Sequence, residues 1–311
     1  MPESGSRSST RSGAHAGSES ESAHRRLARM LDERRALIVP GAANALAARI
    51  IEDLGFEAVY LTGAGVSNTW LGMPDLGFTG LTDLVSHTIA IRQAVALPII
   101  VDADTGFGNA VNAYHTVRAL EQAGANGIQI EDQVAPKKCG HFAGKEVVSR
   151  AEAIERVRAA VEAKRDPDFR IVARTDARAV LGLDEALWRA QAFVEAGADV
   201  VFVEAPQSRE EIRQVMQQGS VPQVLNLVIG GKTPTIPLDE AKQLGVGMLL
   251  YANVALQSAI AGMRTALSRL QVDGMIDERT PGIASFDDRQ RLVRKDFYDG
   301  LEKRYAGRGS D

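Results

Sequence analysis

Two aspartates separated by one residue form the first candidate site. Asp102 and Asp104 stand at the end of an apolar run that begins at Leu97. In an extended segment, side chains two residues apart point the same way, so both carboxylates would face one site. Mg²⁺ takes one or two carboxylates and keeps several waters, which leaves positions for substrate oxygens. The pair predicts a Mg²⁺ site that also accepts Mn²⁺; the alternative is two helix-capping aspartates.

The second candidate is the segment Lys137-Lys138-Cys139-Gly140-His141, which contains the only cysteine of the chain. Two neighbouring lysines would stabilise the thiolate form of Cys139. Gly140 gives the backbone freedom, so the segment has the character of a loop that closes over a site. The alternative is an inert cysteine beside two surface lysines.

Further polar residues end other apolar runs. Because the carboxyl ends of parallel strands meet at one mouth, these side chains are expected to converge there. A single carboxylate at such a position is commonly a helix cap, but a set drawn from six runs points to a binding site. Glu131, next to the aspartate pair, could hold a water of the metal. The set comprises Tyr60 and Thr62, Asp102 and Asp104, Glu131, Arg174, Glu204 and Asn226.

The elements that must position these residues alternate between short apolar runs and longer amphipathic segments. The clearest helix is expected over Ala151–Lys164, where Ile154, Val157 and Val161 share one face. Eight strand–helix units favour a closed (β/α)8 barrel of the TIM type over a doubly wound sheet, whose glycine fingerprint is absent. The expected strands are Ala36–Val39, Ala58–Thr62, Leu97–Asp102, Gly127–Glu131, Arg170–Thr175, Val200–Glu204, Val224–Leu227 and Met248–Tyr251.

Two regions lie outside the alternating pattern. Residues 1–22 contain eight Ser and three Gly, and are expected to be a disordered tail. Residues 27–305 are expected to form one barrel domain, whose last part, from Met263 on, continues as helices beyond the eighth strand.

Composition narrows the class of protein. With 36 Lys and Arg against 40 Asp and Glu, the net charge of −4 argues against nucleic-acid binding. A single cysteine and the lack of a signal-peptide pattern suit a cytoplasmic enzyme. The longest uncharged stretch, Gly245–Met263, reads better as a strand and a helix than as a membrane span.

Taken together, these motifs resemble the isocitrate lyase / phosphoenolpyruvate mutase superfamily over about residues 27–305. Lys137-Lys138-Cys139-Gly140-His141 matches the K-[KR]-C-G-H signature of its carbon–carbon lyase branch, which includes the dimethylmalate and methylisocitrate lyases. The segment from Asp102 to Gly108 matches the metal-binding segment of the family. The resemblance implies a (β/α)8 barrel and a homotetramer that exchanges its C-terminal helices.

The resemblance also implies a role for each candidate residue. It implies Mg²⁺ on Asp102 and Asp104, with Glu131 and Asp75 in its water shell. It implies that Cys139 is the general acid and that Arg174 stabilises the developing charge, while Tyr60 lies against the reacting oxygen. The substrate carboxylate would be held by the backbone of Thr62, Gly63 and Ala64, and the rest of the substrate by Gly140, His141, Glu204 and Asn226.

The implied reaction is cleavage of a 2-hydroxy di- or tricarboxylate to an α-keto acid such as pyruvate and a second carboxylic acid. Methylisocitrate lyases carry arginines for a third carboxylate, where this chain aligns Gln257 and Ser285; Ile229 stands where such lyases often have Glu. A third carboxylate would lack charge-assisted partners. We therefore expect a dicarboxylate of the 2,3-dimethylmalate or alkylmalate type. The alternatives are methylisocitrate, cleavage or decarboxylation of oxaloacetate, and a non-catalytic barrel that senses a carboxylate.

Overall fold

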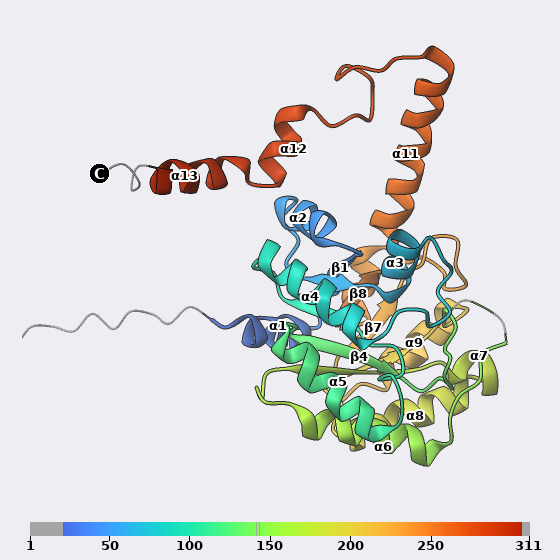
Figure 1. Ribbon diagram of the computed structural model, residues 1–311. Helices are drawn as coiled ribbons and strands as arrows, with labels where there is room; N and C mark the ends of the chain where they lie inside the picture. The colour runs from blue at the N-terminus through green and yellow to red at the C-terminus, as the bar shows by residue number, and fades with distance from the viewer. Residues whose placement is uncertain (1–20, 141, 143, 307–311) are drawn as a thin grey trace, which may run out of the picture.

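The computed structural model describes residues 21–140, 142 and 144–306, and its centre is a closed barrel of parallel strands (Figure 1). Each strand pairs with the next along the chain, and β8 pairs back to β1 with Met248 opposite Leu37. The expected (β/α)8 barrel is therefore confirmed. The strands are β1 (Leu37–Ala42), β2 (Val59–Leu61), β3 (Ile99–Asp102), β4 (Gly127–Glu131), β5 (Arg170–Thr175), β6 (Val200–Val203), β7 (Gln223–Asn226) and β8 (Met248–Tyr251).

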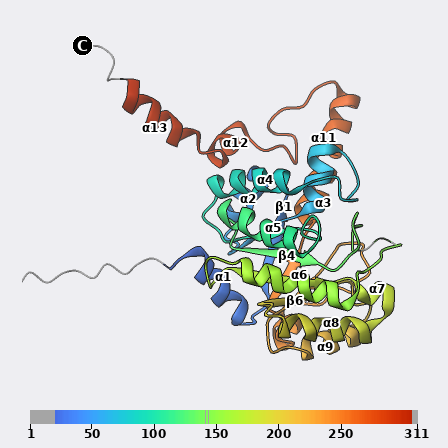
Figure 2. The same ribbon diagram turned by 60° about the horizontal axis from the view of Figure 1, so that its bottom comes forward.

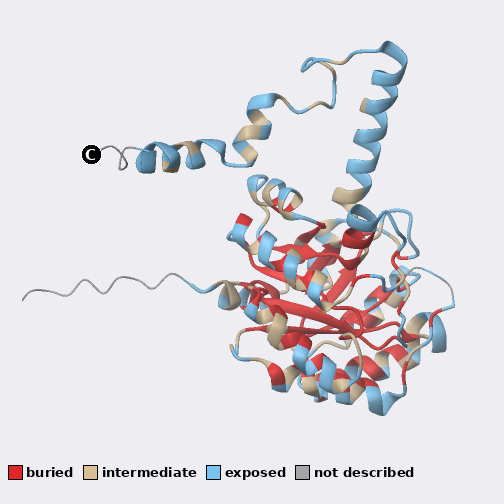
Figure 3. Cartoon of the chain, in the orientation of Figure 1, coloured by how far each residue is buried: buried red, intermediate tan, exposed pale blue. Residues whose placement is uncertain are grey.

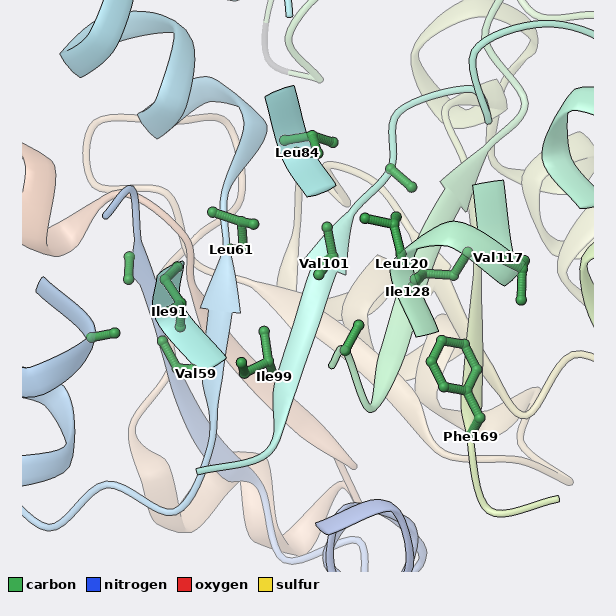
Figure 4. Packing of buried hydrophobic residues seen from close by; sticks show 14 of the residues in the cluster. Val59, Leu61, Leu84, Ile91, Ile99, Val101, Val117, Leu120, Ile128 and Phe169 are labelled. Atoms are coloured by element: carbon green, nitrogen blue, oxygen red, sulfur yellow. The ribbon is translucent and has the colours of Figure 1, made fainter. Parts of the chain in front are cut away.

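Helices surround the strands and cover their outer faces (Figures 1 and 2). Figure 4 shows Leu84 and Ile91 of α4 beside Val59 and Leu61 of β2, in one cluster of buried residues. The helices are α1 (Ala23–Asp32), α2 (Ala45–Asp53), α3 (Gly63–Val66), the π-helix η1 (Ser67–Leu71), α4 (Leu81–Ala94), α5 (Ala110–Gln122), α6 (Arg150–Ala163), α7 (Ala177–Leu181), α8 (Leu183–Glu195), α9 (Arg209–Gln217), α10 (Leu238–Gln243), α11 (Val254–Asp273), α12 (Phe286–Leu292) and α13 (Lys295–Ala306).

Several strands end with an apolar inward residue followed two positions later by a polar one. Side chains alternate along a strand, so residues two apart share a face. The first member of each pair packs in the barrel interior, and the second lies at the carboxyl end of the strand. This alternation builds a layer of polar groups on an apolar floor. The pairs are Ile100 and Asp102, Val172 and Arg174, Phe202 and Glu204, and Val224 and Asn226.

The expected element bounds are confirmed for β4, β5 and β8 and lie within one residue for α6. The expected end of β1 at Val39 is wrong, because the strand continues to Ala42 through Pro40 and Gly41. Proline and glycine usually interrupt strands, but glycine also permits a close approach of two backbones. A side chain at Gly41 would overlap the carbonyl group of Ala252, so this position requires glycine.

The helix α1 closes the end of the barrel opposite the polar layer. It begins at Ala23, before the position 27 expected for the start of the barrel, and Ser22 caps it. Leu27, Met30 and Leu31 pack in the same cluster as the inward residues of the strands. The molecule therefore has one open end, at the carboxyl ends of the strands.

The helices α11, α12 and α13 project from the barrel, and none of their residues is buried (Figure 3). The helix α12 packs against α2, and Arg291 forms an ion pair with Asp53. The stretch 245–263 divides into β8 and the start of α11, as expected. In the described part of the chain, no helix has the length and apolar character needed to cross a membrane.

Candidate active site

A cavity opens at the carboxyl ends of the strands and collects most of the residues expected to act. Gly63 adjoins it beside Asp102, and Asp104 and Glu131 join it through ion pairs described next. His141, expected to contact substrate, lies outside the described residues. The lining comprises Tyr60, Thr62, Ala64, Asp75, Asp102, Lys137, Lys138, Cys139, Gly140, Arg174, Phe202, Glu204, Asn226, Val228, Leu250, Ala252 and Asn253.

Asp102 and Asp104 lie side by side, but not for the expected reason. The chain leaves the extended conformation after Asp102, and Asp104 has φ 48°, in the left-handed region that aspartate tolerates better than most residues. A methyl group added at Gly63 would lie 3.4 Å from both Asp102 Oδ2 and Asp104 Oδ1. The two carboxylates therefore converge beneath Gly63 through a turn, not through strand alternation.

Lys137 places a buried cation against this pair. Its Nζ lies 2.5 Å from Asp75 Oδ1 and 2.8 Å from Asp104 Oδ1. Burial alone would lower the pKa of Lys137, but Asp104, Asp102, Glu131 and Asp75 together raise it well above its ordinary value, so the ammonium persists. We expected Lys137 to act on the thiol of Cys139. In the structure its ammonium group instead pairs with Asp75 and Asp104.

The acids themselves are poorly compensated. Burial raises the pKa of Asp104 to about 7 although Lys137 opposes the shift. Burial likewise raises the pKa of Asp102, and that of Glu131 well above its usual range, against the effects of Lys137 and Arg174. Lys137 and Arg174 therefore do not fully offset the burial of these acids.

Arg174 at the end of β5 joins three acids. Its Nε lies 2.9 Å from Asp176 Oδ2 and 3.4 Å from Glu131 Oε2, and its Nη2 lies 3.2 Å from Glu204 Oε2. The guanidinium also stands over the ring of Phe202, 5.2 Å from its centroid. Asp176 is fully buried, yet Arg174 and Lys145 outweigh that burial and lower its pKa to about 2. Arg174 is thus held as a fixed cation at the mouth.

Tyr60 is oriented by a partner that the sequence did not indicate. Its hydroxyl donates to Gln129 Oε1 over 2.7 Å, and Gln129 Nε2 donates to Asp102 Oδ1 over 3.1 Å. Burial, with the nearby charge of Asp102, raises the pKa of Tyr60 well above its ordinary value. The phenol therefore stays protonated and its proton points to Gln129, which leaves an oxygen lone pair toward the cavity. Gln129 could have been found from its inward position in β4, between Gly127 and Glu131.

The segment that contains Cys139 lies directly on the site. A methyl group at Gly140 would stand 2.6 Å from Glu204 Oε2 and nearer still to Arg174 Nη2, so only glycine fits this close approach. The N–H of Cys139 donates to the carbonyl of Asp75, and Gln133 exchanges two hydrogen bonds with the backbone of Lys138. Lys138 Nζ donates to the carbonyl of Gly144. The thiol-bearing backbone is therefore packed over Arg174.

A second layer of buried charges supports the strand ends from behind. Asp132 accepts hydrogen bonds from the hydroxyl of Thr175 and the N–H of Asp176, at 2.7 and 2.9 Å. Arg189 lies 3.1 Å from the same carboxylate, and Arg156 donates to the carbonyl of Glu131 over 2.7 Å. Sequence reasoning missed Arg156 and Arg189, because a buried arginine on an amphipathic helix has the same local pattern as an exposed one.

A divalent cation fits the chemistry of this donor set. The buried acids of the site, Asp75, Asp102, Asp104, Glu131, Asp176 and Glu204, outnumber its buried cations, Lys137, Lys145 and Arg174, in the portion of the chain described. Although no group of three or more His, Cys, Asp or Glu side chains in that portion is placed to hold a metal ion by itself, no donor reaches Glu131 Oε1. That pattern suits Mg²⁺, which uses one or two carboxylates and completes its shell with water and substrate.

Comparison with known proteins shows which proteins this chain resembles. The family model for phosphoenolpyruvate phosphomutase matches residues 27–271. The 2,3-dimethylmalate lyase of Eubacterium barkeri is 40% identical over 89% of this chain and 96% of its own length. A 2-methylisocitrate lyase of Aeropyrum pernix is 43% identical over 80% of each chain.

Solved structures agree with the sequence relatives. Oxaloacetate acetylhydrolase in complex with 3,3-difluorooxalacetate aligns with a TM-score of 0.86 at 33% identity, over 93% of this chain and 99% of its own. Phosphonopyruvate hydrolase in complex with oxalate and Mg²⁺ aligns with a TM-score of 0.83 at 31% identity, over 92% of this chain and all of its own. The superfamily and the carbon–carbon lyase character expected from the motifs are thereby confirmed. The chain belongs to the phosphoenolpyruvate mutase / isocitrate lyase superfamily.

Proposed function

We propose that the chain cleaves the C2–C3 bond of a 2,3-dimethylmalate or related alkylmalate, giving an α-keto acid such as pyruvate and a second carboxylic acid. The observation that carries this proposal is the packing of the Cys139–Gly140 backbone over Arg174 and Glu204, in the cavity that Asp102 also lines. A thiol acid, a fixed cation and a hard-oxygen site then share one cavity. A barrel that only binds a carboxylate has no use for the acid. The acid must stay reduced, which suits a cytoplasmic enzyme.

Binding would use the first turn of α3 and the carboxylates below it. The N–H groups of Gly63 and Ala64 open this helix, where no carbonyl of the helix can accept them, and Thr62 caps it. They suit the carboxylate next to the 2-hydroxyl. Asp102 and Asp104 would hold Mg²⁺, with Glu131 and Asp75 in its water shell; the chemistry supplied by an ion held there would be a lower pKa of the substrate hydroxyl.

Cleavage would then depend on Arg174 and Cys139. The hydroxyl loses its proton, its C–O bond becomes the carbonyl of the keto acid, and the C2–C3 electron pair passes to the departing carboxylate fragment. Arg174 stabilises the charge that develops, and Tyr60, whose proton is held by Gln129, offers a fixed polar edge beside the reacting oxygen. Cys139 donates its proton to the departing carbon. The hydroxyl proton passes to solvent, and the thiolate that remains on Cys139 takes a proton back from solvent, so the two protons balance and no water is consumed.

The lining of the cavity supports a dicarboxylate with alkyl branches. Phe202, Val228 and Leu250 are apolar members of the lining, and they suit methyl groups. The lining cations of the described residues already have partners: Lys137 and Arg174 with carboxylates, and Lys138 with a carbonyl.

The two positions aligned with the arginines of methylisocitrate lyases do not supply another cation. Gln257 donates to the carbonyl of Ile229, and Ser285 caps α12; neither lines the cavity. Among the residues that the structure describes, a third carboxylate would therefore find no charged partner at either position.

This predicts a preference that substrate kinetics can measure. With a coupled assay for the keto acid, kcat/KM should be higher for 2,3-dimethylmalate than for methylisocitrate. An unmatched buried carboxylate costs about 2–5 kcal/mol, which is about 30-fold or more. Oxaloacetate is the third substrate of the panel, since cleavage or decarboxylation of oxaloacetate is the second candidate. A tenfold preference for methylisocitrate would show that another residue supplies the missing cation.

We also propose that the C-terminal helices are exchanged between subunits of a homotetramer. Ile260, Met263, Leu267 and Leu270 form an exposed apolar stripe at helical spacing along α11. Phe286, Phe297 and Tyr298 extend the exposed apolar surface onto α12 and α13. Apolar surface on this scale, on an arm without buried residues, supports burial against another copy of the chain.

A charge placed in that stripe should break the assembly. Leu267→Asp is expected to reduce the mass measured by light scattering from that of a tetramer to that of smaller species. Val111→Asp is the matched control, because Val111 is 75% exposed on the barrel helix α5. A wild-type chain that runs as a monomer would contradict the proposal.

A further inference from the structure

Lys145 is a buried lysine outside the motif that drew attention to its loop. Its side chain is 1% exposed, and the carboxylate of Asp176 that it contacts is fully buried. Lys145 Nζ lies 2.6 Å from Asp176 Oδ1 and also donates to the carbonyl oxygen of Gly140. Burying an ammonium group is costly unless ions and hydrogen bonds compensate it. Both partners of Lys145 therefore have to be in place for it to occupy this position.

The two partners belong to opposite sides of the active site. Gly140 follows Cys139, the proposed acid, on the loop after β4. Asp176 follows β5 and accepts two hydrogen bonds from Arg174, at 2.9 and 3.1 Å. Lys145 thus joins the backbone that carries the acid to the carboxylate that orients the cation.

These contacts close into a ring. Gly140 bonds to Lys145, Lys145 to Asp176, and Asp176 to Arg174, while Arg174 packs back against Gly140. Asp132 fixes the ring from behind through the N–H of Asp176. Lys145 does not line the cavity, so it would act on the reaction through its partners and not by touching substrate.

We propose that Lys145 is a positioning residue that sets the place of Cys139 relative to Arg174, by tying the Gly140 carbonyl to Asp176. The role rests on the proposed function, in which Cys139 and Arg174 act on the same bond. In this role Lys145 aligns the acid, a task that neither the residues of the Cys139 motif nor the residues at the strand ends perform.

The test uses Cys139 as its own reporter, because it is the only thiol of the chain. The rate of alkylation by iodoacetamide is measured on the full chain by mass spectrometry. Lys145→Met keeps the length of the side chain and removes its donors, and should label about tenfold faster or more, the effect of losing a hydrogen bond to a charged group. Removing a cation disfavours the reactive thiolate, so electrostatics alone would slow the reaction. Faster labelling therefore reports a displaced backbone.

Two further variants serve as a negative and a positive control for the labelling rate. Lys164→Met is the matched control: Lys164 also pairs with an aspartate, Asp199, at 2.9 Å, but away from the site. It should label at the wild-type rate. Gly140→Ala should label faster, because its methyl group collides with Glu204 and Arg174. If Lys145→Met does not fold, Lys145→Gln, which reaches at most one of the two partners, replaces it.

Kinetics then separates this inference from the proposed function. In Lys145→Met, kcat for 2,3-dimethylmalate should fall by about tenfold or more with a smaller change in KM. Wild-type labelling and kcat in the Lys145 variant would overturn the positioning role and leave the lyase proposal intact. Faster labelling in the variant, with no cleavage of any malate by the wild-type chain, would overturn the proposed function and leave the structural tie standing.

Discussion

Cys139→Ser is expected to reduce carbon–carbon cleavage by about 10²–10⁴-fold while the fold and the binding of the keto-acid product persist. A hydroxyl is a far weaker acid than a thiol, so proton transfer to the departing carbon would become slow. The substitution is nearly isosteric, and the backbone of Cys139 is held by the carbonyl of Asp75 whatever its side chain. The measurement is kcat for 2,3-dimethylmalate, with pyruvate binding as the parallel readout.

Chemical labelling gives the same prediction an independent control. Iodoacetamide should inactivate the enzyme in step with modification of Cys139, and bound substrate should protect it. Decarboxylation of oxaloacetate should tolerate Cys139→Ser better, because that reaction depends less on the acid. A serine variant that cleaves every dicarboxylate of the panel at close to the wild-type rate would return Cys139 to an inert role.

The fold was accessible from the sequence because its signal is repeated. Eight apolar runs alternate with amphipathic segments, and each repeat supports the same architecture. The end of β1 was predicted too early because Pro40 and Gly41 look like a turn. Only the neighbouring carbonyl of Ala252, which is distant in the sequence, explains why glycine is needed within this strand. No local pattern carries that information.

In the active site too, some residues could be predicted from the sequence and others could not. Asp102, Glu131, Arg174, Glu204 and Asn226 could be predicted together, because a parallel barrel brings all its carboxyl ends to one mouth. Their convergence follows from topology alone, once the strands are located.

The partners that fix these residues could not be predicted, since they are paired across long stretches of sequence. Lys145 meets Asp176 across 31 residues, and Arg189 meets Asp132 across 57. Spacing along the chain does not determine such pairs. At Asp104 the expected result was right but its reason was wrong. The carboxylates of Asp102 and Asp104 do converge, but through a turn and not through an extended backbone.

Removal of divalent metal is expected to abolish turnover, and Mg²⁺ or Mn²⁺ should restore it. The reason is that Lys137 and Arg174 do not offset the burial of these acids, which raises the pKa of Asp104 to about 7 and that of Glu131 well above its ordinary value. Lewis-acid stabilisation is worth several kcal/mol, so the loss after chelation should be about 10³-fold or more. The measurement is keto-acid release before and after exhaustive chelation.

A stability measurement tests the same site without turnover. Binding to the folded chain alone stabilises it by about 2.7 kcal/mol when the ion is at 100 times its Kd, so Mg²⁺ should raise the Tm of the wild-type chain. Asp102→Asn should lose this rise, because it removes one of the two carboxylates beneath Gly63. Asp168→Asn is the control, since Asp168 pairs only with the exposed Arg25 among its ionic contacts in the described residues. Full turnover after chelation, or an equal Mg²⁺ effect in Asp102→Asn, would remove the metal from the site and with it the hydroxyl activation on which cleavage depends.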